Sequence, residues 1–328
     1  MNEVKQPILE VKNLKQYFKL KRDRLFGEKQ VVKAVDDISF DLFEGETLSI
    51  VGESGCGKST TGRSILRLDE PTSGAIKLFG EDLLIKTKAE LNLARKDIQI
   101  IFQDPFASLN PRRTIRQMLA EAMTIQKVVP KELQDARMIE LMQLVGLRPE
   151  YLERYPHEFS GGQRQRIGIA RALSVNPKII ICDESVSALD VSIQAQILNL
   201  LKKLQRELGL TLLFISHDLS VVRHISDRVI VMYLGKIVEI APKNLLFDSP
   251  KHPYTKALFS AIPTFEKVNR QERIILKGDV PSPISPPSGC RFHTRCKFAT
   301  EQCKNEEPNL RNVQNGQEVS CHHWESLV

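Results

Sequence analysis

A glycine-rich segment early in the chain has the residue types and spacing of a phosphate-binding loop. It consists of Gly52, Glu53, Ser54, Gly55, Cys56, Gly57, Lys58 and Ser59, followed by Thr60, and it fits the pattern G-x-x-x-x-G-K-[ST]. Glycines let backbone N–H groups close around phosphate oxygens, and the helix expected to follow adds partial positive charge. In this pattern Lys58 pairs with the terminal phosphates of ATP, and Ser59 ligates Mg²⁺. The segment therefore predicts a nucleotide site.

A second segment places two acidic residues at the end of an apolar run. The run Ile179-Ile180-Ile181-Cys182 leads directly into Asp183 and Glu184. Taken alone, it is as well explained by a buried strand that happens to end in acids. Beside a phosphate-binding loop, Asp183 is expected to hold Mg²⁺ and Glu184 to polarise the attacking water, because phosphoryl transfer depends on such positioning. The two segments together predict nucleotide hydrolysis.

The elements that must position these residues follow from the periodicity of apolar side chains. Strands and turns are expected over 8–51, a helix over 59–68, a strand over 98–103 and a helical stretch over 114–173. Further strands are expected at 179–184 and 211–218, separated by a helix, and a hairpin over 228–240 should turn near Gly235. Strands that alternate with helices indicate an α/β fold with a mainly parallel sheet covered on both sides.

A third motif carries a resemblance to a known family. The segment Phe159-Ser160-Gly161-Gly162-Gln163 resembles the signature of the ABC ATPases, usually written L-S-G-G-Q, with Phe in place of Leu. Ser160 is a favourable helix N-cap, and the two glycines expose backbone amides, so the segment can start a second phosphate-binding helix. The resemblance implies that Ser160, Gly161, Gly162 and Gln163 bind the ATP held by a partner subunit. A simple helix cap is the alternative reading of the segment in isolation.

Smaller matches to the same family follow in the expected order. Gln103 matches the glutamine that ligates Mg²⁺ and senses the transmembrane partner, and His217 matches the switch histidine that contacts the γ-phosphate. The segment Ser187-Ala188-Leu189-Asp190 matches the D-loop. Phe18 aligns with the aromatic residue that stacks on adenine; the adjacent Tyr17 is an alternative, and core packing remains open for both.

Two further segments resemble the subgroup of peptide importers. They are Gln103-Asp104-Pro105 followed by Ser108-Leu109-Asn110-Pro111-Arg112, and His252-Pro253-Tyr254-Thr255 leading into Ala257-Leu258. The resemblance implies an ATP-hydrolysing subunit that powers import of oligopeptides or dipeptides, with nickel or another solute as the alternative. It implies a P-loop NTPase fold of the ABC type, with an antiparallel β subdomain, a helical subdomain at about 105–175 and a small C-terminal extension. We expect the nucleotide-binding domain over 1–245 and the extension over 246–328.

The resemblance also implies a set of partners. They are a second, paralogous ATPase subunit, two transmembrane permease subunits and, indirectly, an extracytoplasmic peptide-binding protein. Soluble ABC ATPases of DNA repair, iron–sulfur assembly or translation are the competing class, but repair types carry long coiled-coil insertions and translation types carry tandem ATPase domains. This chain shows one ATPase motif set and no long heptad segment. A non-enzymatic metal-sensing module is a third possibility, which the complete ATPase set disfavours.

Four of the six cysteines crowd the C-terminus. Cys290, Cys296, Cys303 and Cys321 are separated by five, six and seventeen residues, which is not the paired spacing of zinc ribbons. A reducing compartment makes disulfides improbable for such a cluster. The set resembles the cysteines that bind a [4Fe–4S] cluster in some dipeptide-importer ATPases. Zinc, with help from His293, His322 or His323, and the absence of any metal remain alternatives.

Composition and charge limit the other functions. The 328 residues carry 41% hydrophobic and 27% charged residues, an ordinary globular composition. A net charge of +7 suits a polyphosphate but decides nothing alone, and 6% aromatic residues disfavour an aromatic platform for nucleic acid. No apolar run approaches the ~20 residues that span a bilayer, and the N-terminus lacks a signal-peptide pattern. We therefore expect a peripheral protein on the cytoplasmic face of the membrane, with no nucleic-acid partner.

Overall fold

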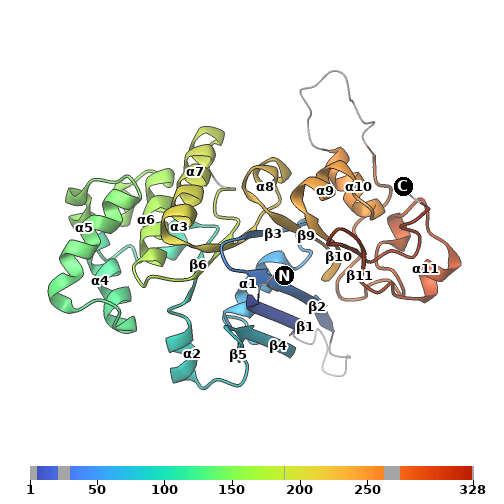
Figure 1. Ribbon diagram of the computed structural model, residues 1–328, viewed down its shortest axis with the longest axis horizontal. Coiled ribbons are helices and arrows are strands. Elements are labelled where there is room, and N and C mark those ends of the chain that lie inside the picture. Colours follow the sequence, from blue (N-terminus) through green and yellow to red (C-terminus); the bar gives the residue numbers. More distant parts are fainter. Residues whose placement is uncertain (1–5, 21–29, 188, 262–273, 327–328) are drawn as a thin grey trace, which may run out of the picture. The chain divides into compact units, whose positions relative to one another are not determined.

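The computed structural model describes residues 6–20, 30–187, 189–261 and 274–326 (Figure 1). The described chain forms two compact units. The first, here called the helical unit, comprises the described residues of Met1–Leu9, Leu42–Thr47 and Lys77–Ile215. The second, the loop unit, comprises those of Glu10–Asp41, Leu48–Ile76 and Ser216–Val328, and it contains the glycine-rich loop.

Three parallel strands form the sheet of the helical unit. They are β6 (Ile98–Ile101), β7 (Ile179–Asp183) and β8 (Thr211–Ile215), in the order β8-β7-β6. Every residue of β7 and β8 is buried, which explains their continuous runs of apolar residues. The register places Ile101 opposite Cys182, so the residues that follow β6 and β7 emerge at the same edge.

Helices make up most of the remainder of the helical unit. They are α2 (Lys88–Ala94), α3 (Pro105–Ser108), α4 (Ile115–Gln126), α5 (Gln134–Leu144), α6 (Gly161–Leu173) and α7 (Val191–Leu208), with short 3₁₀ turns at Lys131–Leu133, Pro149–Glu153 and Pro156–Glu158. Figure 1 shows α4, α5 and α6 side by side, and they contact one another in pairs. Thr114 caps α4 in a capping box with Gln117, and Gly209 ends α7 in the left-handed conformation. The predicted helical stretch is confirmed.

The loop unit contains strands of two sheets. Most of β1 (Pro7–Lys19) lies beside β2 (Val31–Phe43) and β4 (Ser73–Leu78), and the short β5 (Glu81–Asp82) extends β4 within the helical unit. In the other sheet, β3 (Thr47–Val51) pairs in parallel with β9 (Arg228–Tyr233). The antiparallel partner of β9 is β10 (Lys236–Pro242), and Gly235 turns between them with φ +78°, which confirms the predicted hairpin.

The helices of the loop unit are short. They are α1 (Lys58–Ile65), α8 (Leu219–Ile225), α9 (Lys243–Asp248), α10 (Pro253–Ser260) and α11 (Glu301–Asn305), with a 3₁₀ turn at His293–Arg295. Helix α1 follows the glycine-rich loop as expected, although it begins at Lys58 and ends at Ile65. None of the helices in the described ranges is long and apolar enough to cross a membrane.

The C-terminal part of the chain adds two strands that the sequence analysis did not anticipate. Strand β11 (Arg311–Gln314) pairs with β12 (Gln317–Val319), and β12 pairs antiparallel with β10, with Glu239 opposite Val319. Through β11 and β12, the part of the chain after residue 245 thus contributes to the sheet of the loop unit. The aromatic side chains of Tyr233, Tyr254 and Phe292 share one buried cluster there, so this part of the chain also contributes to the core.

Candidate functional site

The glycine-rich loop joins β3 to α1 in a conformation that requires its glycines. Gly52 has φ +152° and Gly57 has φ +104°, values that other residues rarely adopt. A Cβ atom on Gly52 would lie 2.2 Å from the carbonyl oxygen of Met232, and one on Gly57 would lie 2.2 Å from that of Ala34. The loop backbone is therefore packed tightly against neighbouring backbone on one side, which fixes its shape before any ligand arrives.

Lys58 is the buried cation of this loop. Its side chain is 4% exposed, and its Nζ donates to the carbonyl oxygens of Gly52 and Glu53 at 2.9 and 3.1 Å. Carbonyl oxygens are weaker partners for an ammonium than phosphate oxygens, so an incoming phosphate can replace them. Gly57 is the N-cap of α1 and, as a glycine, has no side chain that could bond the first helical turn. A buried ammonium beside a helix start fits the terminal phosphates of a nucleotide.

The acidic strand end lies in the helical unit. Asp183 is the last residue of β7 and is buried, and a carboxylate there suits a hard cation such as Mg²⁺. Glu184 follows with φ +45°, a left-handed backbone that is unusual outside glycine and is often found at functional sites. Gln103 donates a hydrogen bond from Nε2 to Oε2 of Glu184 at 3.0 Å. The structure therefore brings Gln103 and Glu184 together.

The signature segment begins α6 as the sequence predicts. Ser160 is the N-cap: its hydroxyl accepts from the N–H of Gln163, and the Gln163 side chain accepts from the N–H of Ser160. A Cβ atom on Gly162 would lie 2.6 Å from Cγ2 of Ile193, at the start of α7. The second glycine thus has a packing role between two helices, in addition to exposing its amide.

The remaining motif residues are placed separately in the two units. His217 belongs to the loop unit, where it is exposed just before Asp218, the N-cap of α8. Ser187 belongs to the helical unit, and its hydroxyl donates to the carbonyl of Glu184 at 2.9 Å. Ala188, in the middle of the predicted D-loop, lies outside the described residues. Within the helical unit, the D-loop therefore contacts the residue expected to position water.

Tyr17 and Phe18 differ in their environments on β1. The Tyr17 hydroxyl donates to the carboxylate of Asp36, and burial together with this contact raises the pKa of Tyr17. Phe18 keeps 38% of its surface exposed. Tyr17 is therefore engaged within the protein, while Phe18 presents a ring that a flat apolar ligand can cover. This difference favours Phe18 over Tyr17 for adenine stacking.

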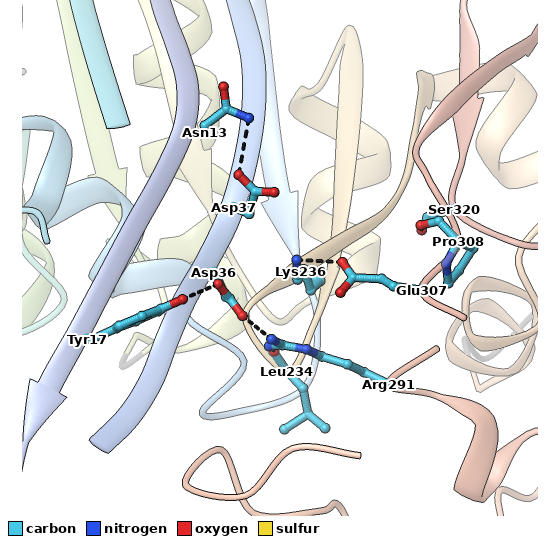
Figure 2. A network of polar contacts seen from close by, with 10 residues as sticks. All are labelled: Asn13, Tyr17, Asp36, Asp37, Leu234, Lys236, Arg291, Glu307, Pro308 and Ser320. Atoms are coloured by element: carbon cyan, nitrogen blue, oxygen red, sulfur yellow. Dashed lines mark hydrogen bonds and ion pairs between the residues drawn. The ribbon is translucent and has the colours of Figure 1, made fainter. Parts of the chain in front are cut away.

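Several polar partners of the glycine-rich loop were missed by sequence reasoning. Glu53 pairs with Arg295, and its N–H donates to the hydroxyl of Tyr254 at 2.9 Å. On β2, Asp36 pairs with Arg291, as Figure 2 shows. Tyr254 had a signal, the segment His252-Pro253-Tyr254-Thr255, but nothing in the sequence pointed to a contact with the loop. The arginines lie too far away in sequence for any local pattern to reveal them.

The four C-terminal cysteines converge on one place. Cys290, Cys296, Cys303 and Cys321 line a single small pocket together with His293, His322 and His323. None of the six cysteines, all of which lie in the described ranges, forms a disulfide. Burial raises the pKa of Cys290 to about 12 and that of Cys321 to about 11. Within the described ranges, no group of three or more His, Cys, Asp or Glu side chains is arranged to hold a single metal ion.

Comparisons with known proteins identify the family of the chain. Residues 35–187 match the family described as ABC transporter, and residues 238–303 match the family described as oligopeptide/dipeptide transporter, C-terminal region. The chain is 54% identical to the oligopeptide transport ATP-binding protein AppF of Bacillus subtilis, over 97% of each chain. It is 48% identical to the dipeptide transport ATP-binding protein DppF of Escherichia coli, over 97% of this chain and 95% of that one.

Solved structures of ATP-binding cassettes are similar as well. The ATP-binding cassette MJ0796, in a dimeric post-hydrolysis state with ADP and Pi, superposes with a TM-score of 0.64 at 30% identity, covering 72% of this chain and 98% of that chain. The cassette cbiO1 of Clostridium perfringens gives a TM-score of 0.63 at 26% identity, covering 74% and 91%. With the phosphate-binding loop, the acidic strand end and the signature segment in place, the chain belongs to the ABC transporter ATPases, among the oligopeptide and dipeptide transport ATP-binding proteins.

Proposed function

We propose that this chain is an ATP-hydrolysing subunit that powers import of oligopeptides or dipeptides through an ABC transporter. The observation that carries the proposal is the joint presence of the ATPase motifs and the C-terminal region over 238–303, which matches the oligopeptide/dipeptide family. The names of the relatives AppF and DppF point to the same solutes. Import of nickel or another solute by the same machinery is the second candidate.

The residues of the site take the following roles in this proposal. Lys58 and the loop amides of 52–60 hold the phosphates, Phe18 covers the adenine, and His217 contacts the γ-phosphate. Ser59, Asp183 and Gln103 supply oxygen ligands suited to Mg²⁺, which would neutralise charge on the transferring phosphoryl group. Glu184 orients and polarises the attacking water, and its contact with Gln103 supports that placement. The start of α6, at Ser160–Gln163, faces the nucleotide of a second ATPase subunit.

The partners follow from this arrangement. A signature segment that completes another subunit's site requires a dimer, and we propose a heterodimer with a paralogous ATPase. The dimer would act on two permease subunits at the cytoplasmic face of the membrane, and an extracytoplasmic peptide-binding protein would deliver the solute. Nucleic acid has no place in this assembly. The division into a nucleotide-binding domain (1–245) and an extension (246–328) stays a prediction.

Purification from membranes in mild detergent tests the proposal directly. We expect the chain to co-purify with permeases and a second ATPase, and the assembly in proteoliposomes to show ATPase activity that rises with peptide-loaded binding protein. Stimulation by nickel-loaded protein alone would favour the second candidate. Co-purification with ribosomes or nucleic acid, without permeases, would contradict the proposal. Full transport by this chain alone beside its permeases would contradict the heterodimer.

We also propose that Cys290, Cys296, Cys303 and Cys321 bind one [4Fe–4S] cluster with a structural role. Four thiols at a single pocket support it, since four cysteines are the usual ligand set of such a cluster. Protein purified without oxygen should be brown and contain about four irons per chain. Stoichiometric zinc in colourless protein, or a metal-free protein with an ordered C-terminus, would contradict the cluster.

A further inference from the structure

The glycine-rich loop, where a polyanion is expected to bind, contains a residue with a carboxylate side chain. Glu53 is the second residue of that loop, and its negative charge opposes an incoming phosphate. Three parts of Glu53 are held by partners in the loop unit. Its carboxylate binds Arg295, its N–H donates to the hydroxyl of Tyr254 at 2.9 Å, and its carbonyl accepts from Nζ of Lys58 at 3.1 Å. The loop is therefore anchored at this residue.

The contact between Arg295 and Glu53 is a bidentate ion pair, which is stronger than a single hydrogen bond between neutral groups. Nη1 lies 2.8 Å from Oε2 of Glu53, and Nη2 lies 3.3 Å from Oε1, so the two planar groups meet in a bidentate pair. The side chain of Arg295 is 8% exposed and that of Glu53 is 29% exposed. Solvent and salt screen such a pair less than they screen an ion pair on the open surface. Arg295 therefore compensates most of the charge of Glu53.

The position of Arg295 is set by the cysteine segment, which we define as residues 290–321. Arg295 ends the 3₁₀ turn His293–Arg295, between Cys290 and Cys296. Phe292, at the start of this turn, packs against Tyr233 and Tyr254 with ring centroids 5.3 and 5.4 Å apart. The aromatic cluster that places Arg295 thus also contains the tyrosine that accepts from the Glu53 amide.

A second arginine of the segment makes a comparable contact. Arg291 donates to the carboxylate of Asp36 and to the carbonyl of Leu234, and Asp36 also accepts from the hydroxyl of Tyr17 (Figure 2). Burial alone would raise the pKa of Asp36, but the contacts with Tyr17 and Arg291 outweigh it and hold that pKa below its usual range. Tyr17 is the neighbour of Phe18. The segment therefore places one cation against the phosphate loop and another against Asp36 on β2, whose carboxylate also binds Tyr17 beside the predicted adenine contact.

We propose that Arg295 is a positioning residue for nucleotide binding, which neutralises and orients the Glu53 carboxylate so that the loop accepts a triphosphate. The cysteine segment is thereby linked energetically to the nucleotide site. The inference rests on the proposed role of residues 52–60 in holding phosphates. Without Arg295, the carboxylate would stay in the loop as an uncompensated charge and repel the ligand. Because such coupling is reciprocal, bound nucleotide must in turn stabilise the cysteine segment.

Equilibrium binding of MgATP to the full-length chain tests the proposal. Arg295→Gln should weaken binding about tenfold, the effect of one unfavourable charge at a partly screened distance. Adding Glu53→Gln should restore the affinity to within about threefold of the original chain, because the repelling charge is gone. Lys304→Gln is the matched control: it breaks an exposed ion pair with Glu301 in the same segment and should leave binding unchanged.

A merely structural role would give a different pattern. If Arg295 only kept the segment folded, the double variant would bind MgATP as weakly as Arg295→Gln alone, and that result would overturn the proposal. So would unchanged affinity in Arg295→Gln. Should Arg295→Gln fail to fold, Arg295→Lys keeps the positive charge but cannot form the bidentate pair, so it should lose less than the roughly tenfold expected for Arg295→Gln; a full tenfold loss there would also count against charge compensation. Failure of the unaltered chain to bind MgATP would instead refute the proposed ATPase role.

Amide hydrogen exchange, measured without nucleotide and with MgATP bound, gives a second readout. Without nucleotide, the amides of the glycine-rich loop should exchange faster in Arg295→Gln than in the original chain, and Lys304→Gln should leave their exchange rates unchanged. With MgATP bound to the original chain, amides of the cysteine segment should exchange more slowly. Unchanged exchange in the segment upon nucleotide binding would contradict the proposed link.

Discussion

The side-chain amide of Gln103 donates a hydrogen bond of 3.0 Å to the carboxylate of Glu184, although the two residues are 81 positions apart in the sequence. Their meeting follows from the sheet. Gln103 comes two residues after β6 and Glu184 one residue after β7, and the register of these parallel strands places Ile101 opposite Cys182. A residue expected to ligate Mg²⁺ and one expected to position water are thus coupled by direct contact.

Glu184→Gln should suppress ATP turnover while preserving ATP binding. The amide keeps the size of the side chain but cannot accept a proton from water, so we expect turnover to fall by about 100-fold or more. Steady-state ATPase measurements on the assembled transporter, with MgATP affinity measured in parallel, check this. Glu140→Gln, which alters an exposed glutamate paired with Arg137, should have no effect on turnover. Near-normal hydrolysis in Glu184→Gln would remove that residue from the proposed role.

Gln103→Ala should lower turnover by about tenfold, because the Glu184 carboxylate loses a partner that orients it. Binding of ATP in the absence of Mg²⁺ should stay unchanged, since Gln103 is proposed to act through the metal and not through the phosphates. Gln99→Ala is the matched control on β6: the Gln99 side chain bonds the carbonyl of Arg95, away from the acidic pair. Equal effects of both substitutions would show that the strand, and not the contact, matters.

The parts of the site that the sequence predicted are those that local pattern determines. The glycine-rich loop, the N-cap at Ser160 and the hairpin turn at Gly235 each depend on residues within one short segment, and the structure has all of them. Each contains a glycine or a capping residue whose backbone requirement can be read directly from its type. The predicted phosphate-binding elements can therefore be recognised from residue types within short segments of the sequence.

The parts that the sequence did not reveal depend on distant pairing. Strand β12 joins β10 through pairs such as Glu239 with Val319, and Arg295 reaches Glu53 across 242 positions. The proline-rich segment 281–289 predicts an irregular backbone, but it does not predict which part of the protein this backbone packs against. Such contacts are decided by the tertiary fold, which no period or motif encodes.

Gly162→Ala should destabilise the helical unit. The added Cβ would lie 2.6 Å from Cγ2 of Ile193, so α6 and α7 must separate or Ile193 must shift, at a cost of about 1–3 kcal/mol. Gly168→Ala is the control on the same helix: a Cβ there meets no atom within 4 Å, and alanine should be neutral or stabilise the helix by about 0.5–1 kcal/mol. The midpoint of urea unfolding distinguishes the two. Equal stability of both variants would contradict the close packing at Gly162.

The last prediction concerns the pH dependence of stability at His252. This side chain is buried, its Nδ1 accepts from the N–H of Tyr254 at 3.0 Å, and its backbone N–H donates to Glu239 at 2.9 Å. Burial lowers the pKa of His252 to about 3, so the imidazole stays neutral in the folded protein at moderately acid pH. In the unfolded chain, a histidine binds a proton below its ordinary pKa of about 6.5.

The sign of the effect follows from these two pKa values. His252 contributes its full stabilisation above pH ~6.5, and this is lost progressively as the pH falls toward ~3, because only the unfolded chain takes up the proton. The loss approaches about 1.4 kcal/mol per pH unit within that window. Burial raises the pKa of nearby Glu239, whose contribution has the opposite sign, being lost as the pH rises. A comparison of variants is therefore more informative than the total slope.

His252→Asn separates the contribution of this residue. Asparagine is a good N-cap and keeps an acceptor for the Tyr254 amide, so α10 should survive the change. Urea unfolding at pH 7, 6 and 5 measures the free energy of unfolding of the variant and of the original chain. As the pH falls, this free energy should decrease less steeply in the variant, with a difference in slope of up to about 1.4 kcal/mol per pH unit, the value for one proton. His157→Asn, at an exposed position, should leave the slope unchanged. If His252→Asn and the original chain lose stability in parallel, the imidazole is charged in the folded state, and the buried neutral histidine inferred from its surroundings is wrong.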